Sequence, residues 1–258
     1  MINTVIVGAG GRMGQAMIGL LPEFPGLALH GAIDSASSPM LGAALGGRTV
    51  GSDLDAALVG AGLMIDFSHA SGARAHIEAA HAARVPLLLG TTGLPAEALA
   101  AAERAARDIP VLVSANTSVG VAVLVDLVQR ASAALGRDFH IEIVEAHHRH
   151  KQDAPSGTAL VLAEAAARGR GTTYDRAAAA QPRGSRGART DEEIGMASLR
   201  GGDVVGEHEV LFLGQGERLS LKHSATDRGI FARGALRAGQ WVAGQRPGRY
   251  QMADVFSQ

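Results

Sequence analysis

The chain has 258 residues, of which 47% are hydrophobic, 19% are charged and none is cysteine, and its formal net charge is −1. This composition is typical of a globular protein with room for two modest domains, and it excludes disulfides, thiolate nucleophiles and cysteine metal ligands. The balanced charge and an aromatic content of only 3% disfavour nucleic acid and an anionic membrane as partners.

Short apolar runs alternate with alanine-rich helical patterns in the first half of the chain. The expected strands cover residues 4–8, 27–33, 63–67, 85–90 and 109–114. The expected helices lie near residues 12–21, 54–60, 71–84 and 95–107. Nearly continuous apolar strands separated by helices predict an α/β fold with a Rossmann-like, doubly wound parallel sheet.

A glycine-rich turn joins the first expected strand to the first expected helix. The stretch VIVGAGGRMG spaces Gly8, Gly11 and Gly14 three residues apart, a variant of the usual dinucleotide pattern. Such glycines let the backbone approach a pyrophosphate, which the amides and dipole of the helix N-terminus would then bind. Asp34 follows the second strand, where a carboxylate can accept the ribose hydroxyls. The order of these features predicts a dinucleotide site rather than a purely structural turn.

Two polar segments, GTTG at 90–93 and SANTSVG at 114–120, each follow a later apolar strand. Because ligands bind at the carboxyl ends of the strands in open α/β sheets, we expect these segments to help hold the nicotinamide and its ribose. Taken alone, each would be an ordinary loop.

The pattern changes after about residue 136. The stretch DFHIEIVEAHH alternates apolar and polar residues, and residues 206–225 indicate two strands joined by a turn at Gly214–Glu217. Alternation is typical of a sheet with one buried face, so we expect a second, α+β domain with a mixed sheet. A helical pattern at 229–245 is expected to return to the first domain. The longest apolar run, Val119–Val128, is too short for a membrane span, and no secretory signal is visible.

The stretch EAHHRHKQDAPSGTA at 145–159 concentrates titratable nitrogen immediately before an expected helix with Ser156 as its N-cap. The helix N-terminus and Lys151 favour an anion, and a histidine can transfer a proton near neutral pH. This combination suits a substrate that carries carboxylates. A metal site is the main rival, because His148 and His150 could share a face, but no third ligand is near. The remaining alternative is a polar loop whose histidines face water.

Residues 168–190 carry six arginines: Arg168, Arg170, Arg176, Arg183, Arg186 and Arg189. We expect a solvated surface loop, since the balanced net charge opposes a nucleic-acid-binding arm.

In order along the chain, VGAGGRMG, DFS, GTTG, ANTSVGV, EAHHRHKQDAPSGTA, RGGDVVGEHEV and the C-terminal stretch from Asp227 to Val255 resemble the 4-hydroxy-tetrahydrodipicolinate reductase (dihydrodipicolinate reductase) family. The resemblance runs nearly end to end, and the 145–158 stretch is its most specific part. It implies NAD(P)H-dependent reduction of 4-hydroxy-tetrahydrodipicolinate to tetrahydrodipicolinate, in the diaminopimelate and lysine pathway.

The resemblance also implies residue roles. His147 would be the general acid/base and Lys151 a second proton donor, while His148, Gly157 and Thr158 would hold the substrate carboxylates. The cofactor, NADH or NADPH, would be lined by Gly8, Ala9, Gly10, Gly11, Arg12, Met13, Asp34, Gly90, Thr91, Thr92, Ser114, Ala115, Asn116 and Thr117. No metal is implied.

The same resemblance implies a dinucleotide-binding domain over residues 1–118, completed by 229–258, and a substrate-binding and oligomerisation domain over 119–228. It further implies a cytoplasmic homotetramer assembled through the C-terminal sheets, with 114–120 as an interdomain hinge.

The residue after Asp34 departs from some members of this family, in which an arginine suits the 2′-phosphate of NADPH. Ser35 stands here, and the Asp34 carboxylate repels that phosphate, so NADH should be favoured, although Arg12 could partly offset this.

Other hypotheses are a different dinucleotide enzyme and an NAD-sensing binding module without activity. Aspartate-semialdehyde dehydrogenase chemistry needs a cysteine, and the Tyr-x-x-x-Lys motif of short-chain dehydrogenases is absent. A sensing module would have no use for His147 and Lys151 beside an anion site.

Overall fold

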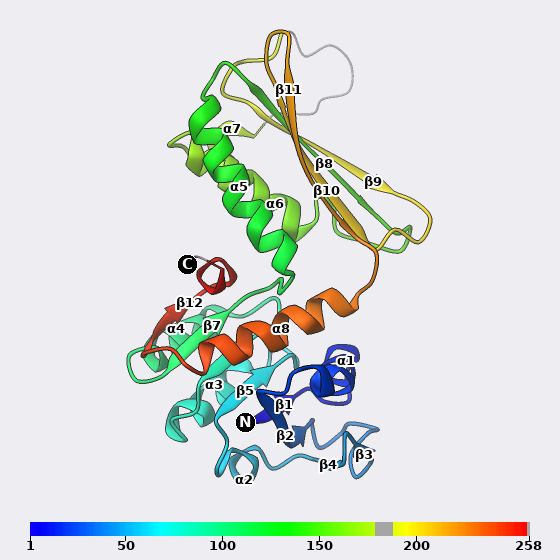
Figure 1. The fold of residues 1–258 in the computed structure, drawn as a ribbon, viewed down its shortest axis with the longest axis vertical. Helices are drawn as coiled ribbons and strands as arrows, with labels where there is room; N and C mark the ends of the chain where they lie inside the picture. Colours follow the sequence, from blue (N-terminus) through cyan, green and yellow to red (C-terminus); the bar gives the residue numbers. More distant parts are fainter. Residues whose placement is uncertain (179–187, 257–258) are drawn as a thin grey trace. The chain divides into compact units, whose positions relative to one another are not determined.

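The computed structural model describes residues 1–178 and 188–256 (Figure 1). The chain forms two compact units, one built from Met1–Val119 with Gly229–Gln258 and the other from Gly120–Arg228. The first unit is therefore discontinuous in sequence. The described helices include none that is long and apolar enough to cross a bilayer.

The first unit is built on an eight-stranded sheet in the order β12-β7-β6-β5-β1-β2-β4-β3. Its strands are β1 (Ile2–Val7), β2 (Leu27–Ile33), β3 (Ala44–Leu45), β4 (Arg48–Gly51), β5 (Leu63–Asp66), β6 (Leu87–Leu89), β7 (Pro110–Val113) and β12 (Gly248–Tyr250). All neighbouring strands are parallel except β3 and β4. The five strands expected from the apolar runs are confirmed, and the sheet extends further at both edges.

Helices cover both faces of this sheet. They are α1 (Arg12–Leu20), α2 (Leu54–Leu58), α3 (Ala73–Ala82), α4 (Ala96–Ala105) and α8 (Gly229–Val242), with short 3₁₀ turns η1 (Leu21–Glu23) and η2 (Met252–Val255). One face packs against α3 and α4 through a core that includes Met64, Ile77 and Ala102. The other face meets α8, where Gly239 lies against Leu63 and Ile65. Alternate residues of β5 thus bury opposite faces, as expected for a doubly wound sheet.

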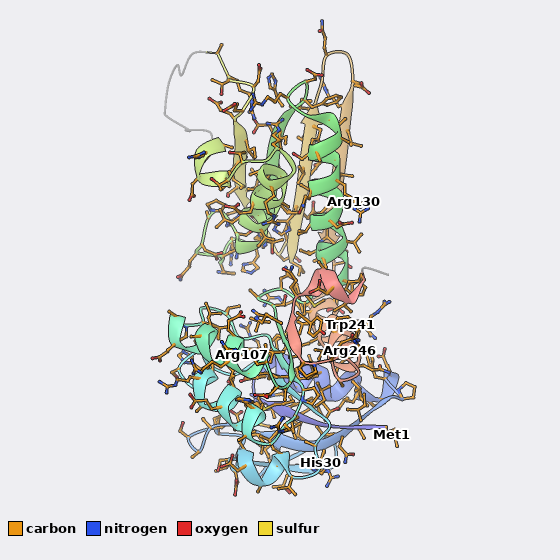
Figure 2. The ribbon with its side chains drawn as sticks, turned by 90° about the vertical axis from the view of Figure 1, so that its left-hand side faces the viewer. Met1, His30, Arg107, Arg130, Trp241 and Arg246 are labelled. Atoms are coloured by element: carbon orange, nitrogen blue, oxygen red, sulfur yellow. The ribbon has the colours of Figure 1, made fainter. Side chains whose placement is uncertain are left out.

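The C-terminal helix α8 completes the first unit. It packs alongside α1 (Figure 1), and Trp241 (labelled in Figure 2) places its ring edge-on to Tyr250 at 5.3 Å between centroids. Helix α8, which was expected to return to the first domain, belongs to the first unit.

The second unit is a four-stranded mixed sheet in the order β11-β10-β8-β9. The strands are β8 (His140–His147), β9 (Ile194–Arg200), β10 (Gly206–Leu213) and β11 (Arg218–Ala225), and β8 pairs parallel with β9 but antiparallel with β10. The helices α5 (Val119–Leu135), α6 (Gly157–Gly169) and α7 (Tyr174–Ala177) belong to the same part of the chain. The longer helices α5 and α6 lie along one face of the sheet (Figure 1).

The alternation in β8 and β10 reflects this single covered face. Ile141, Ile143, Val210 and Phe212 are fully buried under α5 and α6, while their sequence neighbours are only partly buried. The β10–β11 hairpin closes where the Gly214 N–H donates to the Glu217 carbonyl, which confirms the expected turn. The sequence analysis did not identify β9, whose burial does not alternate.

Candidate active site

The turn from β1 to α1 brings two stretches of backbone unusually close together. Gly8 has a φ of +79°, and a Cβ at Gly14 would lie 2.2 Å from the carbonyl oxygen of Gly8. Only glycine at these positions lets α1 begin directly behind β1. No side chain caps α1, and its first turn has no acidic residue, so the first-turn amides retain their positive potential.

The Asp34 carboxylate is fixed beside this turn, immediately after β2. Its Oδ2 accepts hydrogen bonds from the Gly10 N–H at 2.9 Å and the Ser38 hydroxyl at 3.0 Å, and its Oδ1 accepts from the Ser35 N–H at 2.8 Å. The acid predicted from sequence spacing therefore contacts the predicted glycine turn.

The segments that follow β6 and β7 lie at the same carboxyl edge of the sheet. The Thr91 hydroxyl donates to the buried Asp66 carboxylate at 3.4 Å, and the Ser114 hydroxyl donates to the Asn116 carbonyl at 2.6 Å. The Thr117 hydroxyl donates to the Phe231 carbonyl at 2.7 Å. The cofactor-binding residues predicted from the family resemblance thus gather at one sheet edge: residues 8–13, Asp34, 90–92 and 114–117.

In the second unit, His147 is the last residue of strand β8. The ring is 11% exposed, and its Nδ1 lies 2.5 Å from Oε2 of Glu145, which is fully buried. Burial lowers the pKa of His147 below its usual range, while the Glu145 hydrogen bond acts in the opposite direction. His147 is therefore part of a packed polar cluster, and the interpretation of a loop whose histidines face water is wrong for this residue.

A guanidinium from the neighbouring strand holds Glu145. Arg200, at the end of β9, donates from Nη1 to Oε2 at 2.8 Å and from Nη2 to Oε1 at 2.7 Å. Burial alone would raise the pKa of Glu145, but hydrogen bonds from Arg200, Ser198 and His147 outweigh it and lower the pKa to about 2. Glu145 is a carboxylate at any pH near neutrality.

Lys151 lies on the loop after β8 and pairs with Asp153. Its ammonium is 2.8 Å from each carboxylate oxygen, and this hydrogen bond lowers the pKa of Asp153. The Arg200 guanidinium also donates to the Asp153 carbonyl, so the same arginine binds both Glu145 and the loop that carries Lys151.

Helix α6 begins against this cluster. Its N-cap, Ser156, accepts a hydrogen bond from the Ala159 N–H at 3.2 Å, as its sequence predicted, and its own N–H donates to Glu145. A Cβ at Gly157 would meet nothing within 4 Å, so the start of the helix is sterically open. Its first turn carries no acidic residue.

His208 of β10 also belongs to this cluster and contacts both Ser156 and His147. Its Nε2 lies 2.9 Å from the Ser156 hydroxyl, and its ring meets His147 edge-on at 5.1 Å between centroids. Burial, followed by the neighbouring charge of His147, lowers the pKa of His208 to about 4, so this imidazole is neutral at pH 7.

His148 faces the other way and lines an open pocket. The pocket has a volume of about 630 Å³ and is lined by His148, Arg149, His150, Gly202, Asp203 and Arg228. Nε2 of His148 lies 3.2 Å from Nη2 of Arg228. Since arginine can only donate, this nitrogen accepts, and Nδ1 carries the proton of the neutral ring. That buried Nδ1 has no hydrogen-bond partner among the described residues.

Metal chelation finds no geometric support here. Within residues 1–178 and 188–256, no group of three His, Cys, Asp or Glu side chains is arranged to hold an ion.

Two of the clustered arginines are structural. Arg170 donates to the carbonyls of Gly136, Phe139 and Asp191, and Arg189 pairs with Glu142. Arg183 and Arg186 lie outside the described residues.

Sequence reasoning missed Glu145, Arg200, His208 and Arg228 as members of the site. The alternation of β8 could have indicated Glu145, because residues two apart on a strand share a face with each other. No local pattern marks the other three, which reach the site from distant parts of the second unit.

Comparisons with known proteins cover both units. A family model described as "Dihydrodipicolinate reductase, N-terminus" matches residues 2–117, and one described as "Dihydrodipicolinate reductase, C-terminus" matches residues 120–256. A 4-hydroxy-tetrahydrodipicolinate reductase of Anaeromyxobacter dehalogenans is 46% identical over 99% of this chain and 98% of its own length. One from Ruegeria pomeroyi is 45% identical over 98% and 97%. A dipicolinate-bound dihydrodipicolinate reductase from Paenisporosarcina sp. TG-14 has the same fold, with a TM-score of 0.76 and 23% identity over 97% of each chain.

Proposed function

The chain belongs to the dihydrodipicolinate reductase family, and from this premise we propose how its residues divide the work of the reaction. The protein is an NAD(P)H-dependent oxidoreductase that reduces 4-hydroxy-tetrahydrodipicolinate to tetrahydrodipicolinate, in diaminopimelate and lysine biosynthesis. The roles of individual residues, the preferred cofactor and the assembly are the proposals that follow.

The first unit is proposed to bind the dinucleotide at the carboxyl edge of its sheet. The residues fit such a group, because the uncapped first turn of α1 offers amides to a pyrophosphate, and Asp34 is held where it can accept ribose hydroxyls. The segments 90–92 and 114–117 are proposed to contact the nicotinamide end. When bound, the dinucleotide supplies the hydride.

We propose that NADH is preferred over NADPH. The Asp34 carboxylate has one oxygen committed to Gly10 and Ser38 and the other to Ser35, so it is held beside the glycine turn, where it would repel a 2′-phosphate. Steady-state kinetics with both cofactors tests this proposal. A higher kcat/KM with NADH supports it, and equal or better use of NADPH contradicts it.

The second unit is proposed to bind the substrate dicarboxylate. Gly157 and Thr158, at the N-terminus of α6, are proposed to bind one carboxylate, and the space around Gly157 is open. The unpartnered Nδ1–H of His148 and the positive charge of Lys151 are available to carboxylate oxygens as well. Substrate binding would draw Lys151 from its ion pair with Asp153.

His147 is proposed to deliver the proton that completes the reduction, with Lys151 as the second donor. The Nδ1 of His147 is taken by Glu145, which leaves Nε2 as the nitrogen that can exchange a proton with substrate. The hydrogen-bonded pair of His147 and Glu145, near the N-terminus of α6 and Lys151, is the observation that carries this assignment.

The experiment is a steady-state assay of NADH oxidation with freshly prepared 4-hydroxy-tetrahydrodipicolinate, using the His147→Gln variant. Loss of a general acid costs on the order of 10²- to 10⁴-fold in kcat. Because His147 lies in the second unit, the affinity for NADH should stay near the wild-type value. Undiminished turnover of this variant would contradict the proposed role.

Assembly into a homotetramer through the second unit, in the cytoplasm, is also proposed. Within the described chain, the sheet face opposite α5 and α6 has no helix over it, and Leu199 on this face is 56% exposed. We propose that this face is buried against another copy of the chain. Light scattering on the purified protein should give four times the chain mass, and a monomer would contradict the proposal.

A further inference from the structure

Glu145 links separate parts of the proposed substrate site, although it faces no solvent. It is fully buried, and as the residue two before His147 on β8 it lies on the same face of the strand. Its Oε2 accepts from His147, and its Oε1 accepts from the backbone N–H of Ser156 at 3.2 Å. The same carboxylate therefore touches the proposed proton donor and the N-cap of α6.

Arg200 fixes the charge and orientation of this carboxylate. The parallel register of β8 and β9 places Arg200 opposite His147, from where its guanidinium binds both oxygens of Glu145. A bidentate pair of this kind sets the plane of the carboxylate as well as its position. Arg200 also donates to the Asp153 carbonyl, next to the partner of Lys151.

A carboxylate that only accepts determines which nitrogen of His147 carries the proton. Neutral His147 must hold its hydrogen on Nδ1, facing Glu145, and present the lone pair of Nε2 elsewhere. Nε2 lies next to Gly206 of β10, where a Cβ would come within 3.1 Å of it.

Two neighbouring cations, Lys151 and Arg200, oppose the protonation of His147. The cations are Lys151 on the following loop and Arg200 on β9, while His208 on β10 is neutral at pH 7. The Asp153 carboxylate is paired with Lys151. Glu145 is the anion in direct contact with the ring. Its negative charge offsets these cations and raises the pKa of His147, so the buried ring can take up a proton.

We infer that Glu145 is a positioning residue for the reduction, which holds His147 in the Nδ1–H tautomer and sustains its ability to take up the proton that Nε2 delivers. The inference rests on the proposed role of His147. It assigns the role to the pair of His147 and Glu145. Arg200 fixes the orientation of the carboxylate, and the Ser156 N–H connects it to the N-terminus of α6.

Nuclear magnetic resonance of ¹⁵N-labelled histidine side chains tests the inference in the unaltered protein. The His147→Gln variant identifies the His147 signals by their disappearance. We expect neutral His147 in the wild type to carry its proton on Nδ1. A dominant Nε2–H tautomer would overturn the inference, and this measurement does not depend on any variant of Glu145 folding.

The Glu145→Gln variant, which keeps the shape but removes the charge, gives the second measurement. Loss of an anion within hydrogen-bond distance should lower the pKa of His147 by about one unit or more. Since proton delivery needs the protonated ring, the alkaline limb of the kcat profile should move to lower pH by a similar amount. The KM for NADH should not change.

Glu142→Gln is the matched control, because it removes the carboxylate of another arginine-paired glutamate on β8. Its His147 signals should titrate as in the wild type, and thermal unfolding of both variants reports any general loss of structure. An unchanged His147 pKa in a folded Glu145→Gln variant would overturn the inference. Normal turnover by His147→Gln would instead refute the role of His147 and leave the measured pairing intact, so the two failures are distinguishable.

Discussion

Gly206 of β10 lies beside Nε2 of His147, the nitrogen that is proposed to deliver the proton. A Cβ at this residue would lie 3.1 Å from Nε2 of His147 and 3.4 Å from its Cδ2. A methyl group there would crowd the nitrogen from which the proton is proposed to leave.

Replacement of Gly206 by alanine should therefore reduce kcat by roughly tenfold, equivalent to ~1.4 kcal/mol in the activation barrier. The affinity for NADH, measured by equilibrium titration, should be unchanged. Gly201→Ala is the control, because a Cβ at Gly201 would meet nothing within 4 Å. Full activity of Gly206→Ala would show that Nε2 is not the reactive atom.

His208 makes the second unit sensitive to acid. Its pKa is lowered to about 4 in the folded protein from an ordinary value of 6.5, so the unfolded chain binds the extra proton between these two pH values. Stability therefore falls as pH drops through this window, by on the order of 3 kcal/mol for a shift of this size. Glu145, with its pKa lowered to about 2 from 4.5, adds a separate loss only below about pH 4.5.

Urea unfolding from pH 7 to pH 4 should show this dependence, and it should be flatter in His208→Gln. His69→Gln, an exposed histidine of the first unit, should follow the wild-type curve. Parallel curves for all three proteins would mean that His208 does not titrate as its burial requires.

At the residue scale, the sequence indicated those candidate residues that lie close together along the chain. His147, Lys151 and the Ser156 cap fall within ten residues. The sequence patterns on either side predicted the strand before them and the helix after them. Arg200 and His208 could not be found in this way, because β9 and β10 bring them to His147 from more than fifty residues along the chain. Their partners are determined by strand register, which no local pattern encodes.

At the element scale, α8 depends on close backbone contact with the end of β7. A Cβ at Gly234 would lie 1.8 Å from the carbonyl oxygen of Thr117, which is itself almost fully buried. The helix therefore approaches the 114–117 segment through a glycine, and the Thr117 hydroxyl binds the Phe231 carbonyl in the same contact.

The Gly234→Ala substitution should force this helix away from the segment and cost about 1–3 kcal/mol of unfolding free energy, as overpacking does. Gly19→Ala on α1, where nothing lies within 4 Å of the added methyl group, should leave stability equal or slightly raised. Equal chemical denaturation midpoints for the two variants would contradict the close contact.

Elements with a clear hydrophobic period were predicted, and those without one were missed. The apolar strands of the first unit and the alternating β8, β10 and β11 have strong signals. The β3–β4 pair spans only a few residues, and β9 buries three consecutive residues before becoming exposed. In these places pairing with an adjacent strand stabilises the extended conformation. The sequence of the strand itself shows little preference for that conformation.

At the scale of the whole molecule, the chain builds its first unit from two separate segments and inserts the second between them. The C-terminal helical pattern gave only a weak indication of this arrangement, because amphipathicity shows that a helix packs without showing against what. The family resemblance supplied the rest. In the proposed division of the reaction, the first unit binds the cofactor that supplies the hydride, and the second unit supplies the proton.

The most direct test of that division is to measure kcat and the dissociation constant for NADH in the Lys151→Ala variant. Arg130→Ala, which removes an exposed cation from α5 of the same unit, is the control (Figure 2). We expect Lys151→Ala to lose on the order of 100-fold or more in kcat with NADH binding unchanged, and Arg130→Ala to match the wild type. Wild-type turnover by Lys151→Ala, or a loss confined to NADH affinity, would contradict this division of roles.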